Sequence, residues 1–198
     1  MSRRAEVSRA TKETDVRLVL GLEGTGAGTR STGVGFFDHM LDLLARHGRL
    51  DLDVHVTGDL DTGAHHTVED TGIVLGQALG EALGDRAGIV RYGAAVVPMD
   101  EARAACAIDI SGRPFCAFGG LQLPPGDIAG FEHEAAEEFF RAVASAARLT
   151  LHLDLQAGTN THHMIEACFK AFARALRAAT AIDPRESGVP STKGTLTA

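Results

Sequence analysis

The amino-acid sequence repeats itself, and this internal similarity restricts the possible folds more than any other feature of the chain. Residues 50–56 and 149–155 both alternate apolar and polar side chains, which is the pattern of a half-buried strand. Both segments follow a helical stretch with paired phenylalanines, and an Arg-Leu pair begins at Arg49 in one and at Arg148 in the other. After each strand come a polar turn and a second helix that opens with two histidines. The simplest explanation is a duplicated unit.

The remaining segments fit the same plan in both halves. Residues 15–22 and 103–110 alternate like strands. Residues 66–83 and 162–180 carry apolar side chains at helical spacing. Each half is therefore expected to contain strands, a helix, a strand and a helix, in that order.

Few breaks interrupt the chain. Prolines predict turns at Pro98, at Pro114 and in the run 124–126, but no long linker or low-complexity stretch separates the halves. A chain of 198 residues, 44% of them apolar, is enough for one compact domain or two small fused ones. We expect one α+β body made of two tandem half-domains, residues 1–95 and 96–198.

The charge and the cysteines exclude several classes of protein. A net charge of −7 disfavours a general nucleic-acid binder, which needs a basic surface to neutralise phosphates. No apolar run reaches the roughly 18 residues that a membrane helix needs, and the first residues lack the apolar core of a secretory signal. The spacing of Cys106, Cys116 and Cys168 matches neither a zinc ribbon nor a disulfide framework, so reduced thiols are expected. We expect a soluble, cytoplasmic protein without nucleic-acid or membrane partners.

The strongest functional signal is a His-His-x-x-Glu motif that occurs once in each half, at residues 65–69 and 162–166. On a helix, residues i and i+4 project from one face, so His65 and Glu69 can bind the same cation. The second histidine of the motif points about 100° away and is free to serve another metal ion. Imidazole with carboxylate suits Mn, Fe or Zn better than Ca or Mg alone. One such motif is a weak signal, but two at equivalent points of a repeat predict a metal site.

The repeat nominates one further ligand in each half. His39 lies 11 residues before Leu50, and the residue 11 before Leu149 is Glu138. Both side chains are competent ligands, although His39 taken alone would more often be a core or surface histidine. We expect Asp38 to accept a hydrogen bond from the His39 ring and to fix its orientation.

The other histidines have simpler explanations. His55 and His152 fall on the polar faces of their strands and are expected in solvent. His133 lies in a charged stretch and is expected at the surface. His47 ends the first helix, where a protonated ring would suit the helix dipole, although it could also reach the site.

Several motifs together resemble the imidazoleglycerol-phosphate dehydratase family. Besides the two His-His-x-x-Glu motifs they are GFFDHML, DISGRP and the ending GVPSTKG, and the match runs from about residue 5 to 196. The resemblance implies that each half is a four-stranded mixed sheet with two helices on one face. It implies the loss of water from imidazole glycerol phosphate to give imidazole acetol phosphate in histidine biosynthesis. It also implies two Mn²⁺ ions per subunit, with ligands from neighbouring subunits of a homo-oligomer of twenty-four chains built from trimers.

The resemblance also implies metal ligands and substrate contacts, residue by residue. The family usually has histidine at the position of Glu138, so a carboxylate there changes the charge and reach of one ligand, and we still expect it to bind metal. The other metal ligands implied are His39, His65, His66, Glu69, His162, His163 and Glu166. The substrate contacts implied are Glu13, Arg91, Arg113, Lys170, Ser191 and Lys193, and His47 is expected to join them from its place at the end of the first helix.

Two kinds of substrate contact have a physical rationale. Glu13 matches the acid–base residue of the family, although from the residues alone it is an ordinary charge near the start of a strand. A positioned carboxylate of this kind can remove a carbon-bound proton. A phosphate dianion needs several cationic or hydroxyl donors, although each donor taken singly would be an ordinary surface group. The residues that match phosphate contacts are Arg91, Arg113, Ser191 and Lys193.

Two other functions would use the same metal-binding residues. A di-metal hydrolase acting on a phosphorylated small molecule would release inorganic phosphate. A metal-storage or structural shell protein would use the sites only to join subunits. Neither explains the phosphate-binding set together with the order of the motifs, so the dehydratase is the preferred interpretation.

Overall fold

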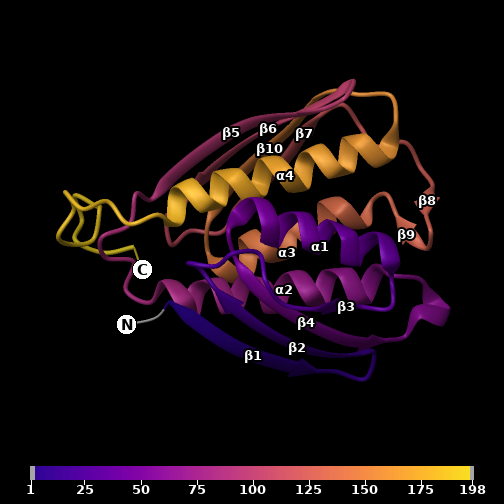
Figure 1. The fold of residues 1–198 in the computed structure, drawn as a ribbon, viewed down its shortest axis with the longest axis horizontal. Coiled ribbons are helices and arrows are strands. Elements are labelled where there is room, and N and C mark those ends of the chain that lie inside the picture. Colours follow the sequence, from indigo (N-terminus) through magenta and orange to yellow (C-terminus); the bar gives the residue numbers. More distant parts are fainter. Residues whose placement is uncertain (1–2, 197–198) are drawn as a thin grey trace.

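The computed structural model describes residues 3–196, and its two halves share the order of their main elements, three strands, a helix, a strand and a helix (Figure 1). The ends of the two predicted halves, residues 1–2 and 197–198, lie outside the described residues. The first half contains β1 (Arg4–Ala10), β2 (Thr14–Gly21), β3 (Arg30–Ser31), α1 (Gly35–Gly48), β4 (Asp51–Gly58), the 3-10 turn η1 (Leu60–Thr62) and α2 (His65–Leu83). The second half contains β5 (Tyr92–Met99), β6 (Ala102–Asp109), β7 (Phe115–Gly120), β8 (Asp127–Ile128), β9 (Phe131–Glu132), α3 (Ala135–Ala147), β10 (Thr150–Ala157) and α4 (Thr161–Thr180).

The two four-stranded sheets have the same topology. The strand order is β1-β2-β4-β3 in one and β5-β6-β10-β7 in the other; in each, the first two pairings are antiparallel and the last is parallel. The helices before β4 and β10 also end alike, at Arg49 with φ 56° and at Arg148 with φ 55°, both left-handed. The predicted α+β fold of duplicated half-domains is confirmed. The second sheet begins with β5 at Tyr92, ahead of the expected division after residue 95.

The helices fill the space between the two sheets (Figure 1). α2 covers the first sheet and α4 covers the second. α1 packs against α4 and α3 packs against α2, so the first helix of each half contacts the second helix of the other half. This exchange of helix partners joins the halves into one body and brings α1 side chains next to α4.

Within residues 3–196 no helix combines the length and the apolar character needed to cross a membrane.

Phenylalanine rings form the centre of the helical layer. Phe37 of α1 contacts Phe139 of α3 edge to face at 5.5 Å between ring centroids, and Phe139 stacks on Phe169 of α4 at 5.1 Å. Phe140 contacts Phe172 at 5.4 Å. All five rings are fully buried, and each contributes about 1.5–3 kcal/mol of hydrophobic stabilisation. The paired phenylalanines of the repeat therefore form the centre of the helical layer, where the contact of Phe37 with Phe139 joins the two halves.

Two glycines of α2 lie in different surroundings and lead to opposite predictions. A Cβ on Gly76 would lie 2.7 Å from Ala146 Cβ and 2.7 Å from the Val143 carbonyl oxygen, whereas a Cβ on Gly80 meets no described atom within 4 Å. Gly76→Ala is expected to lower the free energy of unfolding by about 1–3 kcal/mol, because α2 and α3 must move apart. Gly80→Ala is expected to raise it by about 0.5–1 kcal/mol, because alanine favours a helix more than glycine does. Urea unfolding of the metal-free protein measures both, and equal effects would contradict the close packing of α2 on α3.

The prediction of a turn at Pro98 is wrong. Pro98 lies inside β5, where it pairs with Arg103 of β6. β5 is the edge strand of its sheet, so a proline, which has no N–H to donate, can occupy it without breaking a ladder on both sides. Pro114 and residues 124–126 lie in loops, as predicted.

The three cysteines are free thiols, as expected. Burial raises the pKa of Cys116 to about 11 and that of Cys168 to about 12. Cys106 is buried as well, and burial raises its pKa too. Because nucleophilic cysteines need a thiolate, these three are packing groups.

Candidate metal and substrate site

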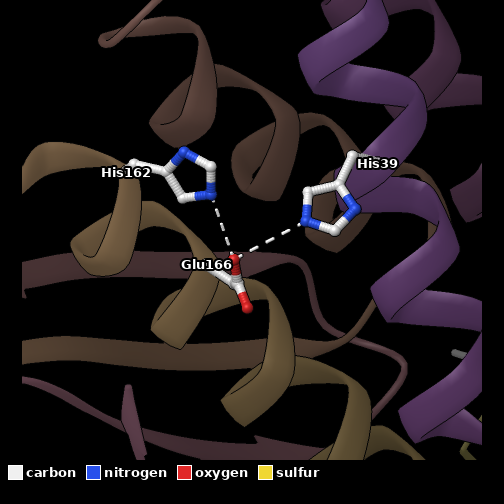
Figure 2. A group of neighbouring side chains, drawn as sticks. All are labelled: His39, His162 and Glu166. Carbon is white, nitrogen blue, oxygen red and sulfur yellow. Dashed lines mark hydrogen bonds and ion pairs between the residues drawn. The ribbon is translucent and has the colours of Figure 1, made fainter. Parts of the chain in front are cut away.

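Three side chains from two helices form the candidate metal-binding group (Figure 2). His39 comes from α1, and His162 and Glu166 come from α4; one ligand atom from each lies within 4.8 Å of the other two. Glu166 Oε2 is 3.2 Å from His162 Nε2 and 3.6 Å from His39 Nε2. The motif places His162 and Glu166 on one helix face, whereas the packing of α1 on α4 supplies His39. The second-half motif therefore acquires its third potential ligand from the first half.

Lys170, one turn further along α4, orients Glu166. Lys170 Nζ lies 2.5 Å from Glu166 Oε1, which leaves Oε2 facing the two histidines. Burial opposes ionisation of Glu166, which is 5% exposed, yet Lys170 and His39 together hold its pKa below the ordinary value. Two imidazole nitrogens and one carboxylate oxygen are a donor set that suits Mn, Fe or Zn. The residues present therefore fit a transition-metal ion.

A carboxylate holds the second histidine of each motif through Nδ1. Asp59 Oδ2 lies 3.0 Å from His66 Nδ1, and Glu101 Oε2 lies 2.7 Å from His163 Nδ1. The hydrogen bond from His163, followed by those from backbone N–H groups at the start of α4, lowers the pKa of Glu101 to about 2. Because an ionised carboxylate only accepts hydrogen bonds, Nδ1 is the donor in both pairs when the ring is neutral, and Nε2 keeps its lone pair.

The first-half motif is not completed in the same way. His65 Nε2 lies 3.6 Å from Glu69 Oε2, but Glu138 does not join them in a group of metal-ligand atoms within residues 3–196. A carboxylate from the second half does reach this helix: both oxygens of Glu132 lie 3.2 Å from the backbone nitrogen of Ala64. Glu132 thus accepts a hydrogen bond from Ala64, the N-cap residue of α2, whose own side chain makes no capping hydrogen bond.

Two predictions about polar side chains are wrong. His133 is 7% exposed rather than at the surface; its Nδ1 lies 2.6 Å from the Pro124 carbonyl oxygen, and its Nε2 has no hydrogen-bond partner among the described residues. The turn that contains Pro124 covers the ring, which a run of charged neighbours in the sequence does not reveal. Asp38 Oδ1 accepts hydrogen bonds from the Thr32 backbone N–H at 2.8 Å and the Thr32 hydroxyl at 2.7 Å. Asp38 therefore fixes the chain at the start of α1 instead of orienting the His39 ring.

His47 lies where α1 passes α4. Burial first, and then the charges of Lys170 and Arg174, lower its pKa, while the charge of Glu166 acts in the opposite direction. The lowered pKa argues against the interpretation in which a protonated His47 stabilises the end of α1. His47 is instead beside the helix that carries the candidate ligands. His55 and His152 are exposed on their strands, as predicted.

Glu13 lies in the turn between β1 and β2, beside the first motif. The Asp59 backbone N–H donates to the Glu13 carbonyl oxygen at 3.0 Å, which places Glu13 beside the residue that holds His66. The hydrogen bond that His66 donates to Asp59 raises the pKa of His66, and the charge of Glu13 raises it further. The Glu13 carboxylate is exposed, and no hydrogen bond or ion pair to it exists in the described part of the chain. Thr14, the next residue, donates a hydrogen bond to Asp70 of α2 and holds the turn against that helix. No local pattern singles out Glu13, because its neighbours in space come from a distant helix.

The predicted phosphate contacts line one hollow at the end of α4. Arg91 Nε lies 2.7 Å from Asp109 Oδ1, and Arg91 Nη1 donates to the Pro190 carbonyl oxygen at 2.8 Å. This second bond fixes the chain just before Ser191, so the segment 188–194 is folded against the body rather than frayed. The hollow has a volume of about 850 Å³, and its lining includes all four predicted residues, Arg91, Arg113, Ser191 and Lys193.

This hollow and the metal-binding group lie at opposite ends of α4. The Arg91 backbone N–H donates to the carbonyl oxygen of Ala179, near the C-terminal end of the helix, while Glu166 lies near its start. Thirteen residues at a rise of 1.5 Å separate Glu166 from Ala179, which is about 20 Å. A small substrate cannot contact both places within one chain.

Comparisons with known proteins identify the family of the chain. A model of the imidazoleglycerol-phosphate dehydratase family matches residues 32–176. The imidazoleglycerol-phosphate dehydratase of Moorella thermoacetica is 56% identical over 99% of this chain and 100% of its own, and that of Azorhizobium caulinodans is 56% identical over 98% of each. The crystal structure of the Staphylococcus aureus imidazoleglycerol-phosphate dehydratase superposes with a TM-score of 0.82 at 42% identity, covering 91% of this chain and 99% of that chain. The chain therefore belongs to the imidazoleglycerol-phosphate dehydratase family.

Proposed function

We propose that this chain is a metal-dependent hydro-lyase that converts imidazole glycerol phosphate into imidazole acetol phosphate in histidine biosynthesis. Membership of the family supports the reaction. The observation that carries the dependence on metal is the group formed by His39, His162 and Glu166, which two helices bring together from opposite halves.

Two Mn²⁺ ions per chain fit the available donors. His39, His162 and Glu166 hold one ion through imidazole nitrogen and carboxylate oxygen. When bound, the metal acts as a Lewis acid that stabilises charge developing on the substrate. The remaining ligands are His65, His66, Glu69, Glu138 and His163, which complete the sites together with residues of neighbouring chains.

Glu13 is the residue that moves the proton. The hydrogen to be removed is on a carbon that no carbonyl activates, so a positioned base is needed. The exposed carboxylate of Glu13, free of hydrogen bonds within residues 3–196, is available for this role. Loss of that proton and of the neighbouring hydroxyl amounts to one water, and the remaining enol becomes the ketone.

The substrate phosphate binds in the hollow at the end of α4. Two guanidinium groups, a hydroxyl and an ammonium group match a dianion with several acceptor oxygens. Anchoring the phosphate orients the reacting carbons and lowers the entropic part of the barrier. The residues of the hollow are Arg91, Arg113, Ser191 and Lys193, and His47 and Lys170 contact the substrate nearer the metal.

The complete site lies between chains of a homo-oligomer. About 20 Å of α4 separates the metal-binding group from the phosphate hollow, so the two must come from different copies if one substrate is to contact both. An assembly of twenty-four chains built from trimers satisfies this requirement, with metal ions joining neighbouring copies. No nucleic acid or membrane has a role in this reaction.

Glu138→Ala is expected to lower metal content well below that of His133→Ala. Glu138 occupies the register position of His39, whereas the Nδ1 of His133 is already used by the Pro124 carbonyl oxygen. Elemental analysis of both purified variants measures the difference. Equal or reversed losses would mean that the register of the second half is misassigned.

The direct test of the proposed function is an assay for imidazole acetol phosphate. Metal-free protein should form no product, and added Mn²⁺ should restore product formation. Release of inorganic phosphate instead of the ketone would replace the dehydratase by a hydrolase. Metal binding without any turnover would leave a structural shell as the function.

A further inference from the structure

The strand pairings define which residues of the two halves are equivalent. Gly21 of β2 pairs with Asp51 of β4, and Asp109 of β6 pairs with Thr150 of β10. Asp51 and Thr150 are the first residues of their strands, and each is the second residue after the left-handed arginine that ends a helix. Gly21 and Asp109 therefore occupy the same place in the two sheets.

Counting back along β2 and β6 from these places leads to a glutamate in both halves. Eight residues before Gly21 is Glu13, and eight residues before Asp109 is Glu101. Both glutamates lie in the turn before the second strand of their sheet. The duplicated fold thus carries a glutamate at the same position twice, each near the second histidine of a His-His-x-x-Glu motif.

The two glutamates are used differently. Glu101 Oε2 accepts a hydrogen bond from His163 Nδ1 at 2.7 Å, and Glu101 Oε1 accepts one from the Asn160 backbone N–H at 2.8 Å, so this carboxylate is committed. In the first half Asp59, which lies in the connection before α2, takes the corresponding place beside His66 Nδ1 at 3.0 Å. Glu13 has no such bond in the described part of the chain.

We propose that Asp59 and Glu101 are positioning residues that hold His66 and His163 with Nε2 directed to a metal ion, and that Asp59 thereby leaves Glu13 free. One half of the duplicated site then only binds metal at this position, while the other also provides the proton-transferring carboxylate. The inference rests on the proposed function, because it assigns roles around the same metal ions.

The physical reason lies in the two nitrogens of imidazole. A carboxylate that accepts from Nδ1–H selects the tautomer with a lone pair on Nε2, restricts rotation of the ring and makes Nε2 a stronger donor to metal. Loss of such a partner typically weakens metal binding about 10- to 100-fold. Glutamine and asparagine keep an acceptor oxygen but can also donate, so they no longer enforce one tautomer.

The test uses Mn²⁺ binding to the metal-free full chain, measured by competition with a chelating dye. Asp59→Asn and Glu101→Gln are each expected to weaken the binding of one ion about 10- to 100-fold. Asp61→Asn and Glu81→Gln make the same chemical changes at exposed carboxylates and should leave binding unchanged. Thermal unfolding of the metal-free variants checks that folding persists, since the amide of Glu101→Gln can still accept from the Asn160 N–H.

A second measurement reports on the rings directly. The ¹⁵N chemical shifts of the neutral imidazoles should reveal the Nδ1–H form of His66 and His163 in the metal-free wild type and a mixture of tautomers in the matching variant. Wild-type affinity and unchanged tautomers in Asp59→Asn and Glu101→Gln would overturn this inference but leave the proposed function standing. A wild-type chain that binds no Mn²⁺ would overturn the proposed metal dependence and this inference with it.

Discussion

Replacing Glu13 with glutamine is expected to lower kcat by about 10²-fold or more, the usual loss when a positioned acid–base group is removed. Glutamine keeps the size of the side chain and part of its hydrogen bonding but cannot accept the proton. Because the missing interaction belongs to the transition state, KM should change far less than kcat. Metal content and assembly should persist, because Glu13 is outside both metal-binding motifs and no hydrogen bond within residues 3–196 depends on its carboxylate.

Glu6→Gln is the matched control for this experiment. Glu6 is an exposed glutamate on the neighbouring strand β1, so the same chemical change there should leave kcat unaltered. A near-normal kcat in Glu13→Gln would transfer the base role to another residue, with His47 as the first to examine. Loss of metal in Glu13→Gln would make Glu13 a ligand and require a different base.

Complete removal of metal is expected to abolish turnover and to break the proposed homo-oligomer into smaller units. The candidate ligands are at the amino ends of α1, α2, α3 and α4, and within residues 3–196 only three of them, His39, His162 and Glu166, form a group. Histidines such as His66 and His163 keep Nε2 available for an ion shared with another copy. Elemental analysis, activity and light scattering before and after chelation measure the three effects together.

His162→Ala provides the matching genetic test, with His152→Ala as its control. His162 belongs to the group with His39 and Glu166, whereas His152 is exposed on β10, with its ring tilted against that of Phe115. His162→Ala should therefore reproduce the loss of metal, assembly and turnover, and His152→Ala should not. An assembly of unchanged size after complete metal loss would rule out the cross-linking role.

Local patterns in the sequence were sufficient to predict the elements and their duplication. Alternation with a period of two identifies β2, β4, β6 and β10, and helical spacing identifies α2 and α4, because both periods follow from backbone geometry over a few residues. The spacing of His162 and Glu166 on one helix face follows for the same reason. Pro98 failed as a turn marker because the cost of a proline depends on whether its strand lies at the edge of a sheet, which is a tertiary property.

Sequence patterns are enough to establish the α+β class, the two similar halves and which residues share a helix face, since these depend on neighbours along the chain. The tertiary fold was needed to show that His39 of the first half meets the motif of the second, because this depends on α1 packing against α4. It also decided that Asp38 bonds to Thr32, that His133 is buried, and that Glu13 and Glu101 are equivalent through strand register. The contact of His39 with Glu166 joins residues far apart in the sequence, and spacing along the chain holds no record of which surfaces pack together.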